Sequence, residues 1–179
     1  MDKDVKEQMI ENLKLDIIRL TNEIEQDIIS KDNGSEQYIK FLNSVSEFIR
    51  WTGQKYKYKY EGDNSRVVKK GEIYFCDLGE NIGSEQSGNR PVVVLQNDTG
   101  NMKGPTTIIA PITNSKKKLP VHVPLADVAE GLKTTGVIRL EHIREISKCR
   151  LGIYIEKLDI NSEGWKKVER AIKKSLDLK

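Results

Sequence analysis

Residues 71–96 read GEIYFCDLGENIGSEQSGNRPVVVLQ, two apolar runs on either side of a polar loop. Both runs, 72–78 and 91–96, are rich in β-branched and aromatic residues, which favour extended strands. Further runs of this kind, bounded by Gly, Pro and Asn, follow at 106–112, 121–125, 137–140, 143–147 and 152–158. Several short, closely spaced strands predict a small antiparallel barrel or a pair of packed sheets.

Helical patterns lie on the amino-terminal side of this β-rich region. One apolar stripe, at steps of three and four, predicts a helix over residues 3–30: Ile10, Leu13, Ile17, Leu20 and Ile24. Asn33-Gly34 predicts a turn, and Ser35 is a suitable N-cap for a second helix. That helix carries a similar stripe: Tyr38, Phe41, Leu42, Val45, Phe48 and Ile49. The two stripes could bury each other as an antiparallel helical hairpin, or they could recruit a partner.

A closing helix is predicted after Asn161 and Ser162, either of which is a plausible N-cap. Its apolar face consists of Trp165, Val168, Ile172 and Leu176. The expected fold class is therefore α+β and mainly β, with an amino-terminal helical hairpin and a carboxy-terminal helix.

The segment between the hairpin and the first strand alternates lysine and tyrosine over residues 55–60. This alternation predicts a strand or linker with one solvated face, although basic residues interleaved with aromatics could also stack on single-stranded bases. Residues 61–65 break all periodicity, so we expect two domains, 1–64 and 65–179. The net charge is −3 over residues 1–63 and +6 over 64–179. A basic excess of this kind favours a polyanion such as nucleic acid.

Composition excludes several classes of protein. The chain has 179 residues, of which 37% are hydrophobic and 32% charged, and a mass of 20.4 kDa, so it is too short for a large multidomain enzyme. Its longest apolar run is far below the roughly 18 residues of a membrane span. The first four residues lack the layout of a signal peptide, so we expect a cytoplasmic protein without membrane association.

Cysteine and histidine usage argues against a metal centre. Cys76 and Cys149 have no C-x-x-C spacing and lie in apolar, strand-like surroundings, so they are expected to be buried free thiols. His122 and His142 form no H-E-x-x-H motif. Acidic residues are not clustered as a magnesium-dependent nuclease requires, and no phosphate-binding glycine loop is present. We therefore expect neither a metal nor a cofactor.

The polar loop 83–91 ends in Arg90-Pro91, directly before a very apolar strand. A guanidinium fixed at the mouth of a strand is well suited to hold a phosphate through two parallel hydrogen bonds. Thr113 ends the predicted strand 106–112 and precedes a second basic run, 116–118. If these two strand ends are neighbours, an arginine and a hydroxyl converge on one site.

Many short motifs resemble the MazF/PemK-type toxins of bacterial toxin–antitoxin systems. They occur in order between residues 69 and 176: Gly71-Glu72-Ile73-Tyr74, Gly83-Ser84-Glu85-Gln86, Arg90-Pro91-Val92, Gln96-Asn97-Asp98, Gly100-Asn101, Pro105-Thr106, Pro111-Ile112-Thr113, Leu119-Pro120-Val121-His122-Val123 and Leu140-Glu141-His142-Ile143-Arg144. The resemblance implies an SH3-like barrel, a homodimer, a cognate antitoxin partner and metal-independent cleavage of single-stranded RNA.

The same resemblance implies roles for individual residues. The catalytic pair of the family falls on Arg90 and Thr113, and the residues near the substrate groove fall on Ser84, Glu85, Gln86 and His122. It leaves the general base open, for which Glu85 is one choice, and it is silent on residues 1–64.

Two other functions remain open. A CcdB-like toxin would use the same barrel to bind a topoisomerase and would not need the pair of Arg90 and Thr113. Alternatively, a non-catalytic regulatory or scaffold protein would work through its helical hairpin.

Overall fold

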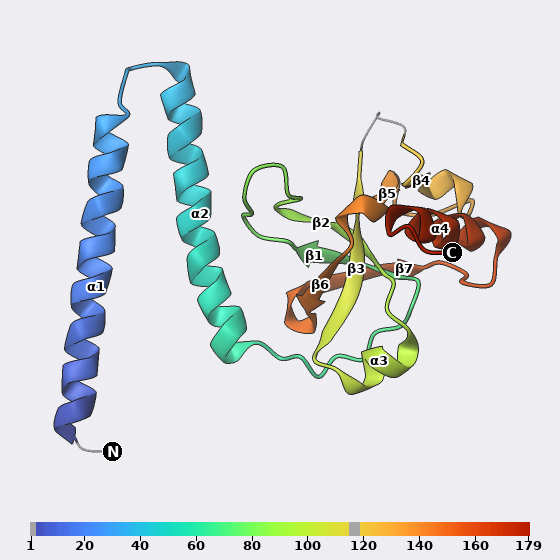
Figure 1. Ribbon diagram of the computed structural model, residues 1–179, viewed down its shortest axis with the longest axis horizontal. Coiled ribbons are helices and arrows are strands. Elements are labelled where there is room, and N and C mark those ends of the chain that lie inside the picture. The colour runs from blue at the N-terminus through green and yellow to red at the C-terminus, as the bar shows by residue number, and fades with distance from the viewer. Residues whose placement is uncertain (1–2, 115–118) are drawn as a thin grey trace. The chain divides into compact units, whose positions relative to one another are not determined.

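The computed structural model describes residues 3–114 and 119–179 (Figure 1). Met1, Asp2 and the basic run at 116–118 lie outside the described residues. Over the described ranges the helices are α1 (Lys3–Ser30), α2 (Glu36–Glu61), α3 (Asp98–Lys103) and α4 (Glu163–Ser175). The strands are β1 (Glu72–Asp77), β2 (Asn89–Val94), β3 (Thr106–Thr113), β4 (His122–Pro124), β5 (Val137–Arg139), β6 (Arg144–Ser147) and β7 (Leu151–Lys157). Three short 3₁₀ helices are η1 (Leu125–Asp127), η2 (Leu140–His142) and η3 (Lys148–Arg150).

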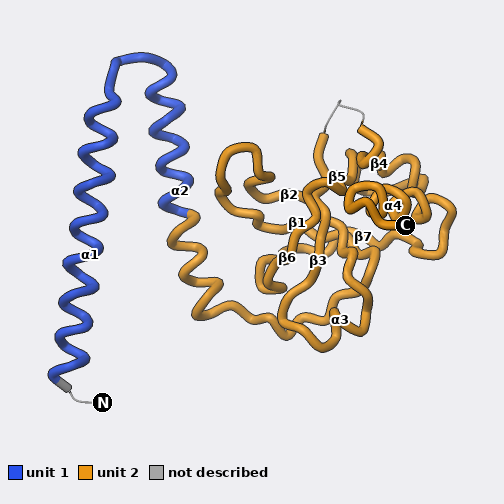
Figure 2. Tube along the Cα trace, in the orientation of Figure 1, with its two compact units in different colours: residues 1–50 blue, residues 51–179 orange. Residues whose placement is uncertain are grey.

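The chain divides into two compact units, residues 1–50 and 51–179 (Figure 2). The first unit is the predicted hairpin of α1 and the start of α2. Ser35 accepts a hydrogen bond from the backbone N–H of Tyr38 at 3.3 Å, as an N-cap does. The Tyr38 hydroxyl donates to the carbonyl of Ile28 at 3.0 Å and ties the two helices together. The predicted turn and both predicted helices are confirmed.

The expectation of a strand or linker over residues 55–60 is wrong, because α2 continues to Glu61. The alternation of lysine and tyrosine masks a helical spacing, in which Trp51 and Tyr58 lie two turns apart on one face. Their rings contact each other, with centroids 6.2 Å apart. Within the second unit this face packs on the end of β1. The contacts made by a helix here outweigh the preference for a strand that the alternation of lysine and tyrosine suggests.

The second unit is built on a seven-stranded antiparallel sheet. Its order is β4-β5-β3-β2-β1-β7, and β6 pairs with the first half of β3. Because β3 pairs with β6 over residues 106–109 and with β5 over residues 112–113, it serves two parts of the sheet. This is the predicted SH3-like small barrel, in an α+β fold that is mainly β.

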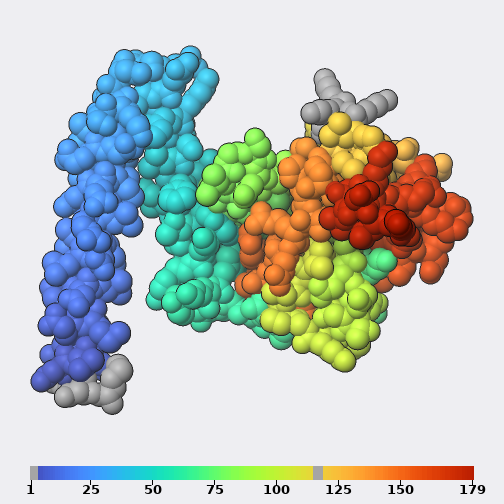
Figure 3. All heavy atoms as spheres, viewed as in Figure 1, coloured from blue at the N-terminus to red at the C-terminus, as the bar shows by residue number. Residues whose placement is uncertain are grey.

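Alternate residues of the strands fill two hydrophobic cores. Ile73, Val93 and Ala110 face one core with Trp165 of α4, and Tyr74 and Val92 face the other. Helix α4 begins at the predicted N-cap Ser162, whose hydroxyl accepts from the backbone N–H of Trp165 at 3.0 Å. In Figures 1 and 3 this helix, in dark red, lies against the region of β4 and η2.

Both cysteines are free thiols, as predicted, but only Cys76 is fully buried. Burial raises the pKa of the Cys76 thiol to about 12. Cys149 is half-buried and lies in η3 rather than in strand-like surroundings.

Candidate active site

Arg90 lies at the start of β2 and Thr113 at the end of β3. The two strands pair antiparallel, with Val92 opposite Pro111. Continuing this register by two residues sets Arg90 opposite Thr113. The two strand ends are therefore neighbours, which is the condition for Arg90 and Thr113 to share one site.

A pocket of about 440 Å³ is lined by both residues, a volume within the range of small-molecule sites. The other lining residues come from several segments: Phe75 of β1, Pro91 of β2, Ile112 and Asn114 near the end of β3, Lys133, Thr134 and Thr135 of the loop before β5, and Ile155 of β7. The pocket thus combines an apolar floor with a polar rim and one fixed guanidinium.

The polar loop before β2 orients that guanidinium. Arg90 Nη1 donates to Gln86 Oε1 at 2.6 Å, and Nη2 donates to the carbonyl of Ser87. Arg90 Nε and Thr113 Oγ1 are both buried, and neither has a hydrogen-bond partner among the described residues. A buried polar atom left unpaired costs about 1–3 kcal/mol. Two such atoms on residues that line one pocket indicate a site prepared for a ligand that supplies hydrogen-bond partners.

The loop itself is held by Asn81. The Asn81 side-chain amide donates to the carbonyl of Leu78 at 2.9 Å and to that of Gln86 at 2.8 Å. Ser84 and Glu85 lie on the exposed rim of the loop and are not among the residues that line the pocket. Of the three loop residues named from the sequence, only Gln86 contacts the Arg90 side chain.

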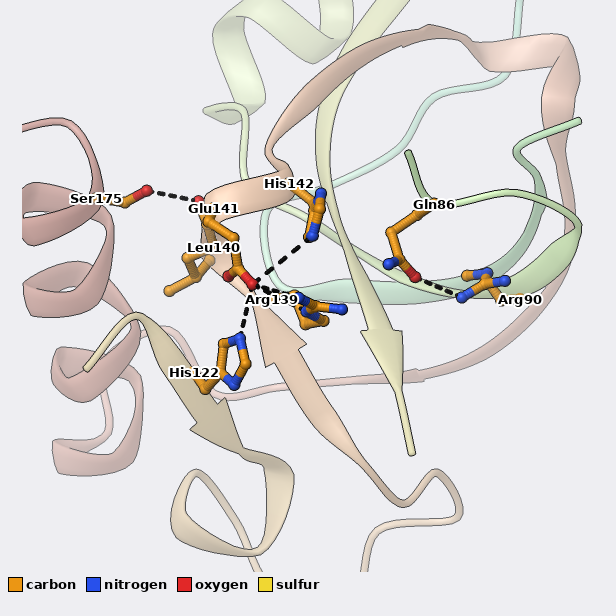
Figure 4. A network of polar contacts seen from close by, with 8 residues as sticks. All are labelled: Gln86, Arg90, His122, Arg139, Leu140, Glu141, His142 and Ser175. Atoms are coloured by element: carbon orange, nitrogen blue, oxygen red, sulfur yellow. Dashed lines mark hydrogen bonds and ion pairs between the residues drawn. The ribbon is translucent and has the colours of Figure 1, made fainter. Parts of the chain in front are cut away.

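His122 belongs to a separate network, centred on Glu141 (Figure 4). His122 Nε2 lies 2.6 Å from Glu141 Oε1, and Arg139 Nη2 lies 2.7 Å from the same oxygen. Partial burial alone would raise the pKa of Glu141, but hydrogen bonds from His122 and Arg139 hold it below its ordinary value. Burial and the Arg139 charge lower the pKa of His142, the third partner of Glu141 in this network.

His122 lines a second pocket, of about 240 Å³, whose basic residues come from α4: Lys167, Arg170 and Lys174. The structure therefore does not bring His122 into the pocket of Arg90 and Thr113.

Lys133, Thr134 and Thr135 line the pocket, although nothing in the sequence led us to expect them there. The one sequence feature that could have drawn attention to them is a polar run between Gly131 and Gly136, directly before a predicted strand. The sequence does not say which pocket such a loop adjoins, because this depends on the pairing of β3 with β5.

Within residues 3–114 and 119–179, no three His, Cys, Asp or Glu side chains gather as a metal site requires. None of the helices in those ranges is both long and apolar enough to cross a membrane.

Comparison with known proteins identifies the fold and the family. Endoribonuclease EndoA of Bacillus subtilis (strain 168) is 47% identical to this chain over 114 residues, which cover 63% of this chain and 97% of that protein. The crystal structure of MazF from Deinococcus radiodurans shares the fold, with a TM-score of 0.55 at 21% identity over 63% of this chain and 99% of that one. A mycobacterial endoribonuclease in complex with its cognate antitoxin gives a TM-score of 0.53 at 21% identity, over 63% of this chain and 97% of the other.

Residues 69–176, more than half of the chain, match a family described as the PemK-like, MazF-like toxin of type II toxin–antitoxin systems. The matched range contains all seven strands and the pocket of Arg90 and Thr113. This chain therefore belongs to the family of PemK-like, MazF-like toxins.

Proposed function

We propose that this protein is the endoribonuclease toxin of a type II toxin–antitoxin system and that it cleaves single-stranded RNA at specific short sequences without a metal ion. The observation that carries the proposal is the presence of a guanidinium and a hydroxyl in one pocket, each with a buried polar atom that finds no hydrogen-bond partner within residues 3–114 and 119–179. A phosphodiester supplies hydrogen-bond acceptors for both groups. The 47% identity to a protein named endoribonuclease supports the same reaction.

In the proposed reaction the ribose 2′-hydroxyl attacks the adjacent phosphorus. A bond forms between the 2′-oxygen and phosphorus, and the bond from phosphorus to the 5′-oxygen breaks. The products are a 2′,3′-cyclic phosphate and a 5′-hydroxyl. The 2′-hydroxyl gives its proton to a base, and an acid protonates the leaving 5′-oxygen.

Arg90 is assigned to the charged phosphorane, because its guanidinium supplies fixed hydrogen-bond donors where negative charge develops. Thr113 positions the scissile phosphate through its hydroxyl. Glu85, the exposed carboxylate of the loop that holds Arg90, is the candidate base. We assign Ser84 and Gln86 to contacts with the flanking RNA. His122 is given no direct contact with RNA, because its buried side chain is bound to Glu141 outside the pocket.

Two protein partners belong to the proposal. A cognate antitoxin is expected because a structural relative is described in complex with its own. A homodimer is expected from the family resemblance.

The deciding experiment incubates the purified full chain with a long RNA of mixed sequence in EDTA. We expect cuts at a short recurring sequence, with 2′,3′-cyclic phosphate and 5′-hydroxyl ends. A deoxyribose at the nucleotide that supplies the 2′-hydroxyl should abolish each cut. Cleavage that persists on the deoxy substrate would overturn the mechanism, and intact RNA would favour a topoisomerase-binding toxin or a scaffold.

Residue roles are tested by Arg90→Ala and Arg90→Lys. Loss of one transition-state contact lowers the rate about 10²- to 10³-fold, and lysine should recover little of it because it cannot reproduce the planar fork. Arg144→Ala is the matched control, since Arg144 is a half-buried arginine on β6 that does not line the pocket. A normal cleavage rate for Arg90→Ala would show that the site is elsewhere.

A further inference from the structure

The loop of residues 131–136 forms one wall of the pocket through Lys133, Thr134 and Thr135. We propose that Glu156 is a positioning residue for RNA cleavage, which fixes this wall opposite Arg90 by accepting hydrogen bonds from two successive backbone amides. The inference rests on the proposed function and adds a residue that does not itself line the pocket.

The carboxy-terminal end of the loop is fixed to the strand of Thr113. Val137 pairs with Thr113, and Gly136 precedes it with a φ of +127°. A Cβ at Gly136 would lie 2.9 Å from the Thr113 carbonyl oxygen and 3.1 Å from Ile112 Cγ2. Only glycine allows this conformation at so close an approach. This end of the loop is therefore fixed to the strand of Thr113 by its own backbone, independently of Glu156.

The other end of the loop depends on Glu156 of β7. Glu156 Oε2 accepts from the backbone N–H of Lys133 at 2.9 Å, and Oε1 accepts from that of Thr134 at 2.7 Å. Each carboxylate oxygen thus holds one of two adjacent amides. Burial alone would raise the pKa of Glu156, but these hydrogen bonds outweigh it and lower the pKa. The carboxylate is therefore ionised, and both contacts are of the stronger, charge-assisted kind.

Glu156 is itself held by the sheet. It pairs with Ile73 of β1, a fully buried core residue, and its neighbour Ile155 lines the pocket floor with Phe75. The pairing of β1 with β7 shifts register directly after Ile73, so Glu156 belongs to the last regular pairs before the irregularity. The loop between Gly131 and Gly136 takes its position at Lys133 and Thr134 from the Glu156 carboxylate.

This arrangement predicts which kinetic constant depends on Glu156. In this proposal Lys133 and Thr134, at the end of the wall that Glu156 holds, contact the bound RNA away from the breaking bond, so they contribute equally to the ground state and the transition state. Loss of such an interaction raises KM and leaves kcat unchanged. Arg90→Ala, in contrast, should lower kcat.

The test compares Glu156→Gln with Glu72→Gln in the full chain. Glutamine keeps one acceptor oxygen and loses the other. Glu72 is the matched control, because it is a half-buried glutamate that also accepts a backbone N–H, from Lys69 at 2.8 Å, and does not line the pocket. The substrate is a fluorogenic oligoribonucleotide that spans a cut made by the wild-type enzyme.

We expect Glu156→Gln to raise KM about tenfold, the size of one lost hydrogen bond to a charged group, with kcat within about twofold of wild type. Amide hydrogen exchange, followed by NMR, should accelerate at Lys133 and Thr134 in this variant only. If Glu156→Gln does not fold, Glu156→Asp retains the charge but shortens the reach, and it should show the same split.

Three results would overturn the inference: a KM equal to that of Glu72→Gln, a fall in kcat at unchanged KM, or unchanged exchange at both amides. If the wild-type chain cuts no RNA, the proposed function fails separately. The positioning role is then judged by fluorescence anisotropy with the same RNA, where Glu156→Gln must bind more weakly than Glu72→Gln.

Discussion

At the scale of single residues, the pocket leaves two polar atoms without a partner among the described residues, whereas a buried hydroxyl at the other end of β3 is paired. Thr107, also on β3, donates from its buried hydroxyl to Asn101 Oδ1 at 2.7 Å. The hydroxyl of Thr113 is buried without a partner among the described residues. One strand therefore offers two threonines whose hydroxyls should have opposite consequences for stability and activity.

Thr113→Val removes the unpaired hydroxyl and keeps the shape of the side chain. Because no hydrogen bond is lost and the buried oxygen is removed, the free energy of unfolding should stay the same or increase. The cleavage rate should fall about 10²- to 10³-fold if the hydroxyl binds the scissile phosphate in the transition state. Urea unfolding and single-turnover cleavage of the same sample measure both quantities.

Thr107→Val is the control, and we expect it to lower the free energy of unfolding without changing the cleavage rate. It leaves Asn101 without its donor and should lower the free energy of unfolding by about 1–3 kcal/mol. Its rate per folded molecule should equal that of wild type. If Thr113→Val is destabilised like Thr107→Val and cleaves normally, the Thr113 hydroxyl has only a structural role.

At the scale of elements, the last turns of α2 brace the strand that leads into the active-site loop. The Trp51 ring occupies the space beside Gly79, where an added Cβ would lie 2.0 Å from Trp51 Cε2. The Arg150 guanidinium lies 5.2 Å from the Trp51 ring centre, and the Tyr58 hydroxyl donates to Asp77 Oδ2 at 3.3 Å. The loop that orients Arg90 begins at Gly79, directly after these contacts.

Trp51→Ala should therefore destabilise the barrel unit. The substitution leaves space beside Gly79 and removes the cation–π partner of Arg150, and for a half-buried tryptophan we expect a loss of about 1–3 kcal/mol in the free energy of unfolding. Tyr60→Ala, on the same helix but 64% exposed, should change it by less than about 0.5 kcal/mol. Equal unfolding curves for Trp51→Ala and wild type would show that the end of α2 does not support the barrel.

The same elements explain what the sequence could predict. All seven strands were predictable, because each is a short β-rich run between turn residues. Helix α3 was not, since it has only six residues, one of them Gly100, and depends on its N-cap Asn97. Arg90 and Thr113 could be named because each ends a strand, whereas the wall of Lys133 to Thr135 depends on contacts far apart in the sequence.

At the scale of the whole molecule, the hairpin and the barrel differ in how they are stabilised. The barrel unit has two buried cores. In α1, large apolar side chains such as Ile10, Leu13 and Ile17 are more than half exposed. A two-helix hairpin with so little buried surface needs a partner to be stable, and we expect it to pack on a second hairpin or on a barrel. The domain boundary after residue 64 remains a prediction.

Two truncations test this organisation. Deletion of residues 1–50 removes only the hairpin unit, so the remaining chain should unfold within a few degrees of the barrel transition of the full protein and should still cleave RNA. Deletion of residues 1–64 also removes Trp51 and Tyr58, together with Asn64, whose Oδ1 accepts from the backbone N–H of Cys149 at 3.0 Å. The longer deletion should therefore melt lower by several degrees, as expected for a loss of about 1–3 kcal/mol. Equal melting temperatures for the two truncated chains would show that residues 51–64 do not stabilise the barrel unit.

The deletion of residues 1–50 also tests what the hairpin does. The hairpin is acidic and the barrel region is basic, so a tethered hairpin that competes with RNA would lower activity in the full chain. Faster cleavage by the truncated chain would support that role, and a smaller number of subunits per particle, measured by sedimentation, would support a role in assembly. Full-length and truncated chains that agree in both cleavage rate and number of subunits would exclude both roles, because the exposed stripe of α1 would then contribute neither to assembly nor to inhibition.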